Sequence, residues 1–293
     1  MQLNIKQIAR NISLIENRVA GFESLLLQNG QRKAGIVGLT GAPGAGKSTL
    51  ADALIAEMLA DGKRVAVLCI DPSSPFNMGA LLGDRVRMSK WYNNDRVYIR
   101  SMASRNALGG LSPMIIEVTE YLKAAGFDFI LVETVGVGQN EIDIAGLADV
   151  TVVVMVPEGG DEIQTMKSGI MEIGDVFVVN KCDRPDADRF VRYLKAMLAP
   201  VFQRVHKEIP VIKTIAATHA GIAELYHAVI AQFHNLFSTD RKYWLLAERA
   251  YQLIQERKMK DVSKLQLFND IKQYFETNEQ FNLYNFVAQQ TVK

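Results

Sequence analysis

The residues best suited to chemistry lie in a glycine-rich segment near the start of the chain, Gly41-Ala-Pro-Gly-Ala-Gly-Lys-Ser48. This segment fits the pattern G-x-x-x-x-G-K-[ST], with an apolar run before it and a helical pattern after it. The glycines let backbone N–H groups surround phosphate oxygens, and the N-terminus of the following helix adds its dipole. We therefore predict a nucleotide phosphate site, in which Lys47 contacts the β- and γ-phosphates and Ser48 binds Mg²⁺. The residues predicted to hold the phosphates are Gly41, Ala42, Pro43, Gly44, Ala45, Gly46, Lys47, Ser48 and Thr49.

A second motif indicates which base is bound. Asn180-Lys181-Cys182-Asp183 fits N-K-x-D and directly follows the apolar run Val176–Val179. The Asp183 carboxylate can accept hydrogen bonds from guanine N1–H and from its 2-amino group, whereas adenine lacks this pair of donors. We expect the stem of Lys181 to lie along the base and the backbone N–H of Ala216 to reach the guanine carbonyl. The motif predicts a guanine nucleotide, GTP or GDP.

Acidic residues follow two other apolar runs. Asp71 comes after Val65–Ile70 and Glu133 after Phe127–Val132. In a parallel sheet, ligands gather at the carboxyl ends of the strands, so both acids are expected near the phosphates. The predicted Mg²⁺ ligands are Ser48, Asp71, Asp84 and Glu133, and the predicted catalytic residues are Lys47, Asp71 and Glu133. A helix cap or a loop salt bridge is the alternative role for each carboxylate.

The residue that orients the attacking water is left open. Ras-like proteins place a glutamine directly after the glycine that corresponds to Gly136, but Val137 stands there and Gln139 lies two residues further on. Either a carboxylate positions the water, or Gln139 does so in another geometry. With this part of the machinery altered, slow intrinsic hydrolysis is expected.

The elements that must position these residues alternate along the chain. The expected strands are Gly35–Thr40, Arg64–Ile70, Val97–Ser101, Phe127–Glu133, Val150–Val156, Val176–Asn180 and Val211–Ala216. The expected helices between them are Ser48–Ala60, Pro113–Ala125, Glu162–Ile173, Asp188–Leu198 and Ile222–Phe237. Strands that are apolar throughout and alternate with helices predict an α/β fold of the P-loop NTPase type, with a doubly wound, mainly parallel sheet flanked by helices.

Both ends of the chain are expected to be helical extensions. Residues 2–29 contain one or two amphipathic helices, and Arg241–Lys260 and Ser263–Thr277 form two more. The predicted domains are therefore residues 1–30, 31–238 and 239–293. The tail after residue 280 is apolar and aromatic, and it either packs back on the core or forms a subunit contact.

Composition narrows the class of protein. The 293 residues are 48% hydrophobic and 22% charged, which is typical of a globular protein and excludes general disorder. A formal net charge of +1 gives no electrostatic reason to expect binding to nucleic acid or to an anionic membrane. The cysteines, Cys69 and Cys182, cannot form a disulfide scaffold and favour a reducing compartment. Because the apolar runs are also too short to span a bilayer, we expect a cytoplasmic protein.

Five segments of the chain resemble one family closely. They are GAPGAGKST; DPSSP with LGDRVRM; RSMASRNALGGLS; ETVGVGQNEIDIAGLADV; and PEGGDEIQTMKSGIMEI with NKCD. Together they cover about half of the chain and resemble the methylmalonyl-CoA mutase-associated GTPases of the MeaB/ArgK type. The resemblance implies a GTPase that acts as a chaperone for an adenosylcobalamin-dependent acyl-CoA mutase, most simply methylmalonyl-CoA mutase. Such a protein gates the loading of cofactor and protects or reactivates the mutase.

The resemblance also implies partners and further site residues. The partners would be the mutase and an adenosyltransferase, the chain would form a homodimer, and cobalamin would be bound by the partner and not by this chain. Gly159–Gly169 resembles a switch that couples the nucleotide state to the mutase, which makes Lys167 a candidate for signalling. The chain departs from the family where Cys182 and Arg184–Asp186 replace the usual small and polar residues after Asn-Lys.

Two other functions fit parts of the sequence. A P-loop kinase acting on a small molecule would share the phosphate loop but would not need N-K-x-D. A GTPase that delivers nickel would need clustered Cys or His ligands, and the histidines, His206, His219, His227 and His234, do not form an obvious metal-binding pattern.

Overall fold

The computed structural model describes residues 3–27, 34–71, 88–104, 111–134, 141–158, 168–205, 209–234, 240–259, 262–277 and 282–290. The chain divides into two compact units, Met1–Lys242 and Tyr243–Lys293. The domain limits expected from the sequence stay predictions.

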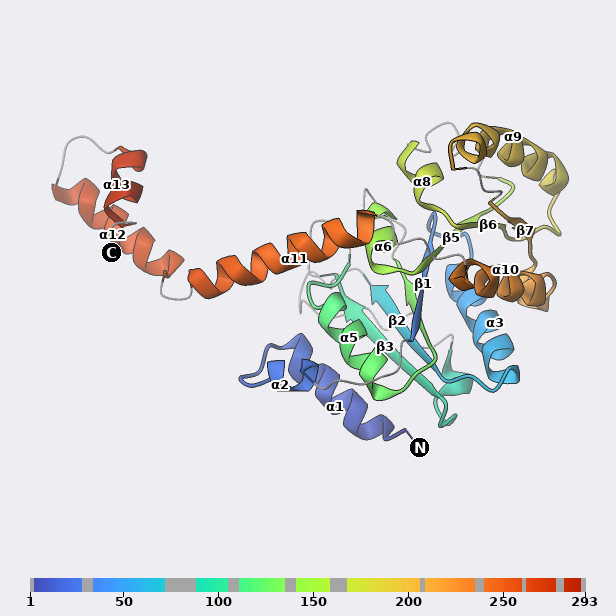
Figure 1. Ribbon diagram of the computed structural model, residues 1–293, viewed down its shortest axis with the longest axis horizontal. Coiled ribbons are helices and arrows are strands. Elements are labelled where there is room, and N and C mark those ends of the chain that lie inside the picture. The colour runs from blue at the N-terminus through green and yellow to red at the C-terminus, as the bar shows by residue number, and fades with distance from the viewer. Residues whose placement is uncertain are drawn as a thin grey trace. The chain divides into compact units, whose positions relative to one another are not determined.

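The first unit is built around a seven-stranded parallel sheet, as predicted (Figure 1). Its strands are β1 Gly35–Thr40, β2 Val65–Asp71, β3 Val97–Ala103, β4 Phe129–Glu133, β5 Val150–Met155, β6 Val176–Val179 and β7 Val211–Lys213. The order across the sheet is β3-β2-β4-β1-β5-β6-β7, so β1 lies between β4 and β5. The order of the strands reverses beside β1, and a ligand crevice forms at the carboxyl ends of the strands where this happens.

Helices account for most of the remaining described residues. They are α1 Ile5–Glu16, α2 Glu23–Leu26, α3 Lys47–Ala60, α5 Ile115–Ala125, α6 Glu141–Leu147, α8 Ser168–Ile173, α9 Ala187–Val205, α10 Ile222–His234, α11 Asp240–Lys258, α12 Lys264–Thr277 and α13 Leu283–Gln290. Two short 3₁₀ helices, η1 Ser89–Trp91 and η2 Ala216–Thr218, lie beside β3 and after β7.

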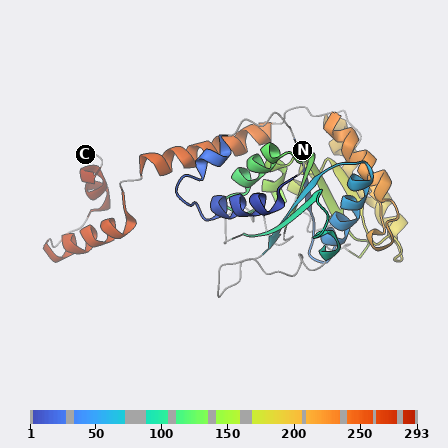
Figure 2. The same cartoon turned by 90° about the horizontal axis from the view of Figure 1, so that it is seen from below.

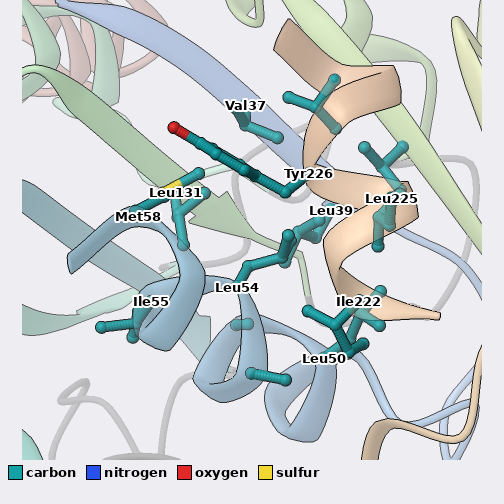
Figure 3. Close-up of a cluster of buried hydrophobic side chains, with 14 of the residues drawn as sticks. Val37, Leu39, Leu50, Leu54, Ile55, Met58, Leu131, Ile222, Leu225 and Tyr226 are labelled. Carbon is teal, nitrogen blue, oxygen red and sulfur yellow. The ribbon is translucent and has the colours of Figure 1, made fainter. Parts of the chain in front are cut away.

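Alternate strand residues point to two separate helix layers. Val37 and Leu39 of β1 join one apolar cluster with residues of α3 and α10, which pack against each other (Figure 3). Val153 and Phe177 belong to a cluster on the opposite face with α8 and α9. Gly38 also lies on that second face, where a Cβ would come within 2.5 Å of Ile144 of α6. Because helices cover both faces, the strands are apolar at every position.

The N-terminal segment is helical, as its pattern predicts, and it packs on α5 within the first unit. In α1, Ile8, Ile12 and Ile15 are buried at helical spacing, and the helix lies along α5 (Figure 2). The side chain of Asn4 caps α1 by accepting a hydrogen bond from the Gln7 N–H at 3.0 Å. These contacts fix α1 and α5 on the same side of the sheet as one layer.

The second unit exposes large apolar side chains. In α11, α12 and α13, the exposed fractions of Trp244, Leu265 and Tyr284 are 76%, 71% and 84%. Phe286 of the tail is buried, whereas its neighbours Tyr284 and Val287 are exposed. Among the described helices of the chain, none has both the length and the apolar character needed to cross a lipid bilayer.

Some element limits differ from those expected. β7 ends at Lys213 and not at Ala216, because the Thr214 side chain and the Ala216 N–H turn toward Asn180. α3 begins one residue early, at Lys47, and α9 continues to Val205. Helix α6 was not predicted, since its seven residues are too few for a clear periodicity.

The amino end of the sheet, where the strands begin, carries a repeated aspartate contact. An aspartate directly before a strand accepts a hydrogen bond from a backbone N–H at the start of a neighbouring strand. The pairs are Asp128 with Arg64 N–H at 2.8 Å, Asp149 with Ile36 N–H at 2.9 Å, and Asp175 with Thr151 N–H at 2.8 Å. Each contact fixes the register of two neighbouring strands at the point where their backbone hydrogen bonds begin.

The chain that enters β3 is attached to α3. The Trp91 indole N–H donates to Asp52 Oδ1 at 2.7 Å, and Lys90 Nζ lies 2.7 Å from Asp52 Oδ2. Lys90 Nζ is also 4.9 Å from the centre of the Trp91 ring. Asp52 lies one helical turn beyond Ser48, so this contact is close to the phosphate loop along α3.

Candidate nucleotide-binding site

The phosphate loop connects β1 to α3, and its backbone requires glycine at two positions. Gly41 has a φ of +135°, and a Cβ there would lie 2.0 Å from the carbonyl oxygen of Val154. Gly46 has a φ of +93°, and its Cβ would come within 2.4 Å of Asn180 Nδ2. Other residues would be strained in both conformations and would clash with their neighbours. The loop thus brings its backbone N–H groups and the start of α3 to the carboxyl end of β1.

Lys47 lies inside this loop. Its side chain is buried, and its Nζ donates to the carbonyl oxygens of Gly41 and Ala42 at 2.7 and 3.0 Å. Because Lys47 is the first residue of α3, its ammonium adds a full charge to the positive end of the helix dipole. The arrangement is suited to stabilising the negative charge of phosphate groups.

Two carboxylates stand at the carboxyl ends of adjacent strands, and one of them contacts a hydroxyl of the phosphate loop. Asp71 ends β2 and Glu133 ends β4, and both side chains are buried. The Ser48 hydroxyl donates to Glu133 Oε1 at 2.7 Å. Neighbouring ligands of an octahedral Mg²⁺ ion lie about 2.9 Å apart when each metal–oxygen bond is about 2.0–2.1 Å. The kind of oxygen donors, and the one distance between Ser48 and Glu133, therefore fit Mg²⁺.

Some predicted site residues lie outside the described part of the chain. They are Asp84, Gln139, which is one of the candidates for orienting the water, and Lys167. The structure brings Ser48 and Glu133 into contact and places Asp71 on the neighbouring strand end.

The loop after β6 is joined to the phosphate loop by two side chains. Asn180, which is buried, donates through Nδ2 to the carbonyl oxygen of Ala45 at 2.9 Å. Lys181 has a φ of +58° and donates through Nζ to the carbonyl oxygen of Gly44 at 2.7 Å. Asp183 follows two residues later and is exposed. The two motifs therefore form one continuous site, although Asn180 and Ala45 are 135 residues apart in the sequence.

Thr214 belongs to the segment expected near the base, but the role of its side chain was not predicted from the sequence. Its hydroxyl donates to Asn180 Oδ1 at 3.1 Å, and the Ala216 N–H donates to the same oxygen at 3.0 Å. These two donors fix which way the Asn180 amide faces, so that its Nδ2 points at the phosphate loop. The contact of Ala216 with the base stays a prediction. The sequence feature that could have indicated this contact is a threonine near the end of the last predicted strand.

Cys182, in the middle of the second motif, is held by a backbone contact and by burial. Its thiol donates to the carbonyl oxygen of Val179 at 3.0 Å, and burial raises the pKa of Cys182 above its ordinary value. Burial therefore favours the protonated thiol. The described residues contain no cluster of three or more His, Cys, Asp or Glu side chains that could hold a metal ion.

Several known proteins are similar to this chain over most of its length. A protein of Pyrococcus horikoshii that carries the name of a GTPase is 44% identical over 231 residues, which are 76% of this chain and 72% of that protein. The GTPase ArgK of Escherichia coli is 33% identical, over 85% of this chain and 73% of that protein. The fused isobutyryl-CoA mutase of Geobacillus kaustophilus is 35% identical over 82% of this chain, but the match spans only 24% of that longer protein.

A solved structure has the same fold. The crystal structure of an LAO/AO transport system kinase matches with a TM-score of 0.64 and 24% identity, over 98% of this chain and 92% of that one. The family model described as methylmalonyl-CoA mutase-associated GTPase MeaB matches residues 8–270, which include the phosphate loop and the N-K-x-D motif. The chain therefore belongs to the MeaB family of methylmalonyl-CoA mutase-associated GTPases.

Proposed function

We propose that this protein is a Mg²⁺-dependent GTPase that acts as a chaperone for an adenosylcobalamin-dependent acyl-CoA mutase. The hydrogen bonds from Asn180 and Lys181 to the phosphate loop support guanine as the base, because they join the N-K-x-D motif to the phosphate site. The observation that supports a mutase as the partner is the similarity to the fused isobutyryl-CoA mutase. In that protein, a region similar to this chain forms part of a mutase polypeptide. A fusion of this kind favours physical coupling between the two activities.

In this proposal each side chain has a defined task. Lys47 moves from the carbonyl oxygens of the loop to the β- and γ-phosphates and stabilises the charge that develops during transfer to water. Asp183 accepts hydrogen bonds from the guanine edge. Asn180 holds the base loop against the phosphate loop, and Thr214 and Ala216 hold Asn180.

Ser48, Asp71 and Glu133 would hold the Mg²⁺ ion, together with Asp84. The ion would neutralise charge on the phosphate oxygens when it is bound. Glu133 already accepts a hydrogen bond from Ser48, which keeps the hydroxyl oriented toward the strand ends. Hydrolysis would be slow without the partner, since the position of the usual glutamine carries Val137.

The proposed partners follow from the proposed role as a mutase chaperone. Cobalamin belongs to the mutase, an adenosyltransferase supplies it, and this chain gates its delivery. The exposed apolar side chains of the second unit, such as Trp244 and Leu265, support a homodimer, because water is a poor environment for such a surface.

The test is GTP turnover with and without purified methylmalonyl-CoA and isobutyryl-CoA mutases at equal concentration, with ATP as the control nucleotide. We expect one mutase to raise GTP turnover and to leave ATP turnover unchanged. Turnover that ignores both mutases and rises with a small-molecule acceptor would replace this proposal with a P-loop kinase. Turnover that rises only with Ni²⁺ and a hydrogenase precursor would replace it with nickel delivery.

A further inference from the structure

The loop that carries Asp183 has a second attachment, formed by an ion pair. The guanidinium of Arg184 contacts Glu158 Oε1. Arg184 directly follows Asp183 in the loop after β6, and Glu158 lies in the loop after β5, the strand beside β6. The pair thus links two neighbouring loops at the carboxyl end of the sheet.

The backbone around Asp183 needs such an attachment. Lys181 and Asp186 both have left-handed φ angles, +58° and +63°, and neither is a glycine. Non-glycine residues persist in this region only where the surrounding contacts hold them. The Arg184 N–H donates to the carbonyl oxygen of Lys181 at 3.1 Å, which closes a turn around Asp183.

The two sides of this turn are held in different ways. On the side before Asp183, Asn180 is fixed to the phosphate loop, to Thr214 and to Ala216. On the side after Asp183, the Arg184 side chain reaches Glu158. Among the described residues, the next ion pair on that side, between Asp188 and Lys213, lies five residues beyond Asp183, so the Arg184 contact is the attachment nearest to the carboxylate.

Charge favours the same contact. Lys181 and Arg184 both attract the Glu158 carboxylate, and the hydrogen bond from Arg184 is the main cause that lowers the pKa of Glu158 below its ordinary value. Glu158 therefore stays ionised at neutral pH. The two side chains are 43% and 50% exposed, so salt will screen their attraction.

We propose that Arg184, held by Glu158, is a positioning residue for guanine selection. The ion pair keeps the turn from Lys181 to Asp186 in the conformation that presents the Asp183 carboxylate to the base. This inference rests on the proposed role of Asp183. It assigns to Glu158 and Arg184 a part in nucleotide discrimination that is separate from the N-K-x-D motif itself.

The test compares GDP with IDP, whose base lacks the 2-amino group that Asp183 would bind. Affinities and dissociation rates are measured on the full-length protein with N-methylanthraniloyl derivatives of both nucleotides. Exposed ion pairs contribute little, so Arg184→Glu or Glu158→Arg should reduce the GDP/IDP affinity ratio about two- to fivefold. The charge-swapped double variant should restore the ratio, and about 1 M KCl should remove the difference between the single variants and the wild type.

Controls separate positioning from folding and from general charge effects. Arg189→Glu makes the same charge change on the exposed surface of α9, a few residues from Arg184, and should leave the ratio unchanged. The thermal unfolding midpoint of all these variants should stay within a few degrees of the wild type. A single variant with an unchanged ratio, or a double variant that fails to restore it, would overturn the inference.

Asp183→Asn distinguishes this inference from the proposed function. If Asp183→Asn reduces the GDP/IDP ratio and Arg184→Glu does not, Asp183 reads the base and only the positioning role of Arg184 is wrong. If Asp183→Asn leaves the ratio unchanged, the guanine-binding part of the proposed function is wrong, and this inference is overturned with it.

Discussion

The two ends of the sheet use the same kinds of side chain for opposite purposes. At the amino end, Asp149 and its counterparts Asp128 and Asp175 accept hydrogen bonds from backbone N–H groups of neighbouring strands. At the carboxyl end, Glu133 and Asn180 contact the phosphate loop and the first residues of α3. At the amino end, breaking an aspartate contact would disturb the register of two strands. At the carboxyl end, a bound nucleotide can take over the contacts that the site side chains make.

The comparison predicts which property each end controls. Removing a side chain at the amino end should lower the free energy of unfolding and spare activity. Removing one at the carboxyl end should lower activity or change its specificity and spare the fold. The following variants test this division, beginning with the largest expected effect.

Lys47→Ala should reduce GTP hydrolysis by about 100-fold or more, because it removes the ammonium that would stabilise the transferred phosphoryl group. Phosphate release under single-turnover conditions measures the loss, and circular dichroism should show an unchanged fold. Lys63→Ala, just beyond the far end of α3, changes a side chain that is 40% exposed and serves as the matched control with normal turnover. Retained hydrolysis in Lys47→Ala would show that this loop is not the phosphate site.

Asp183→Asn should weaken GTP binding by about 10- to 100-fold and favour xanthosine triphosphate, because the amide offers a donor where guanine needs an acceptor. Competition of both nucleotides against a labelled GDP measures the change. Asp188→Asn, an exposed aspartate that pairs with Lys213, is the control. An unchanged preference for GTP would remove Asp183 from base recognition.

Asp149→Ala should lower the free energy of unfolding by about 1–2 kcal/mol, because the Ile36 N–H loses its carboxylate acceptor. Urea denaturation measures the change, and GTP turnover per folded molecule should stay within a factor of about two, a small effect on the scale of catalytic losses. Asp149→Asn retains an acceptor oxygen and should be less destabilised. A variant that folds normally but loses turnover would abolish the proposed division between the two ends.

Tyr226→Phe should change the pH dependence of stability. Burial, followed by the hydrogen bond to Asp61 at 2.7 Å, raises the pKa of Tyr226 above its ordinary 10.0. Above about pH 10 the unfolded chain loses this proton while the folded chain keeps it, so the wild type loses stability as the pH rises. Tyr226→Phe should lose less stability there in urea titrations, and Tyr193→Phe, whose side chain is exposed, should behave like the wild type.

In acid, the same hydrogen bond makes stability fall as the pH falls, which is the opposite of its effect in alkali. The hydrogen bond from Tyr226 is the main cause that lowers the pKa of Asp61 below its ordinary 3.8. This contribution to stability is present above that pH and is lost as the pH falls through the lowered pKa. Tyr226→Phe should therefore also lose less stability in acid than the wild type. An equal loss of unfolding free energy in the two proteins between neutral and acid pH would contradict this prediction.

Local patterns in the sequence were enough to predict the sheet and the phosphate loop. The strands are apolar at successive positions because both faces are covered, and such runs can be recognised without knowing their partners. The limits of β7 could not be predicted, because they depend on Asn180, a residue about 34 positions earlier, which draws Thr214 away from the strand direction. Contacts between distant segments leave no periodic signal in the sequence.

The amino-end aspartates were missed although a signal existed. Asp128, Asp149 and Asp175 each stand directly before an apolar run, in the same position relative to three different strands. A single aspartate before a strand indicates only a turn, and its use becomes clear when the neighbouring strand is known. The same is true of the Arg184–Glu158 pair, because the order of β5 and β6 in the sheet brings the two loops together.

The attachment of Trp91 to Asp52 has a consequence for spectroscopy. The chain has two tryptophans, Trp91 and Trp244, so Trp244→Phe leaves one indole as the source of tryptophan fluorescence. That indole donates to a carboxylate one helical turn from Ser48, and its emission depends on the charge and hydration of that neighbour. The protein thus carries a native fluorophore beside its phosphate loop, with which nucleotide exchange can be followed without a label.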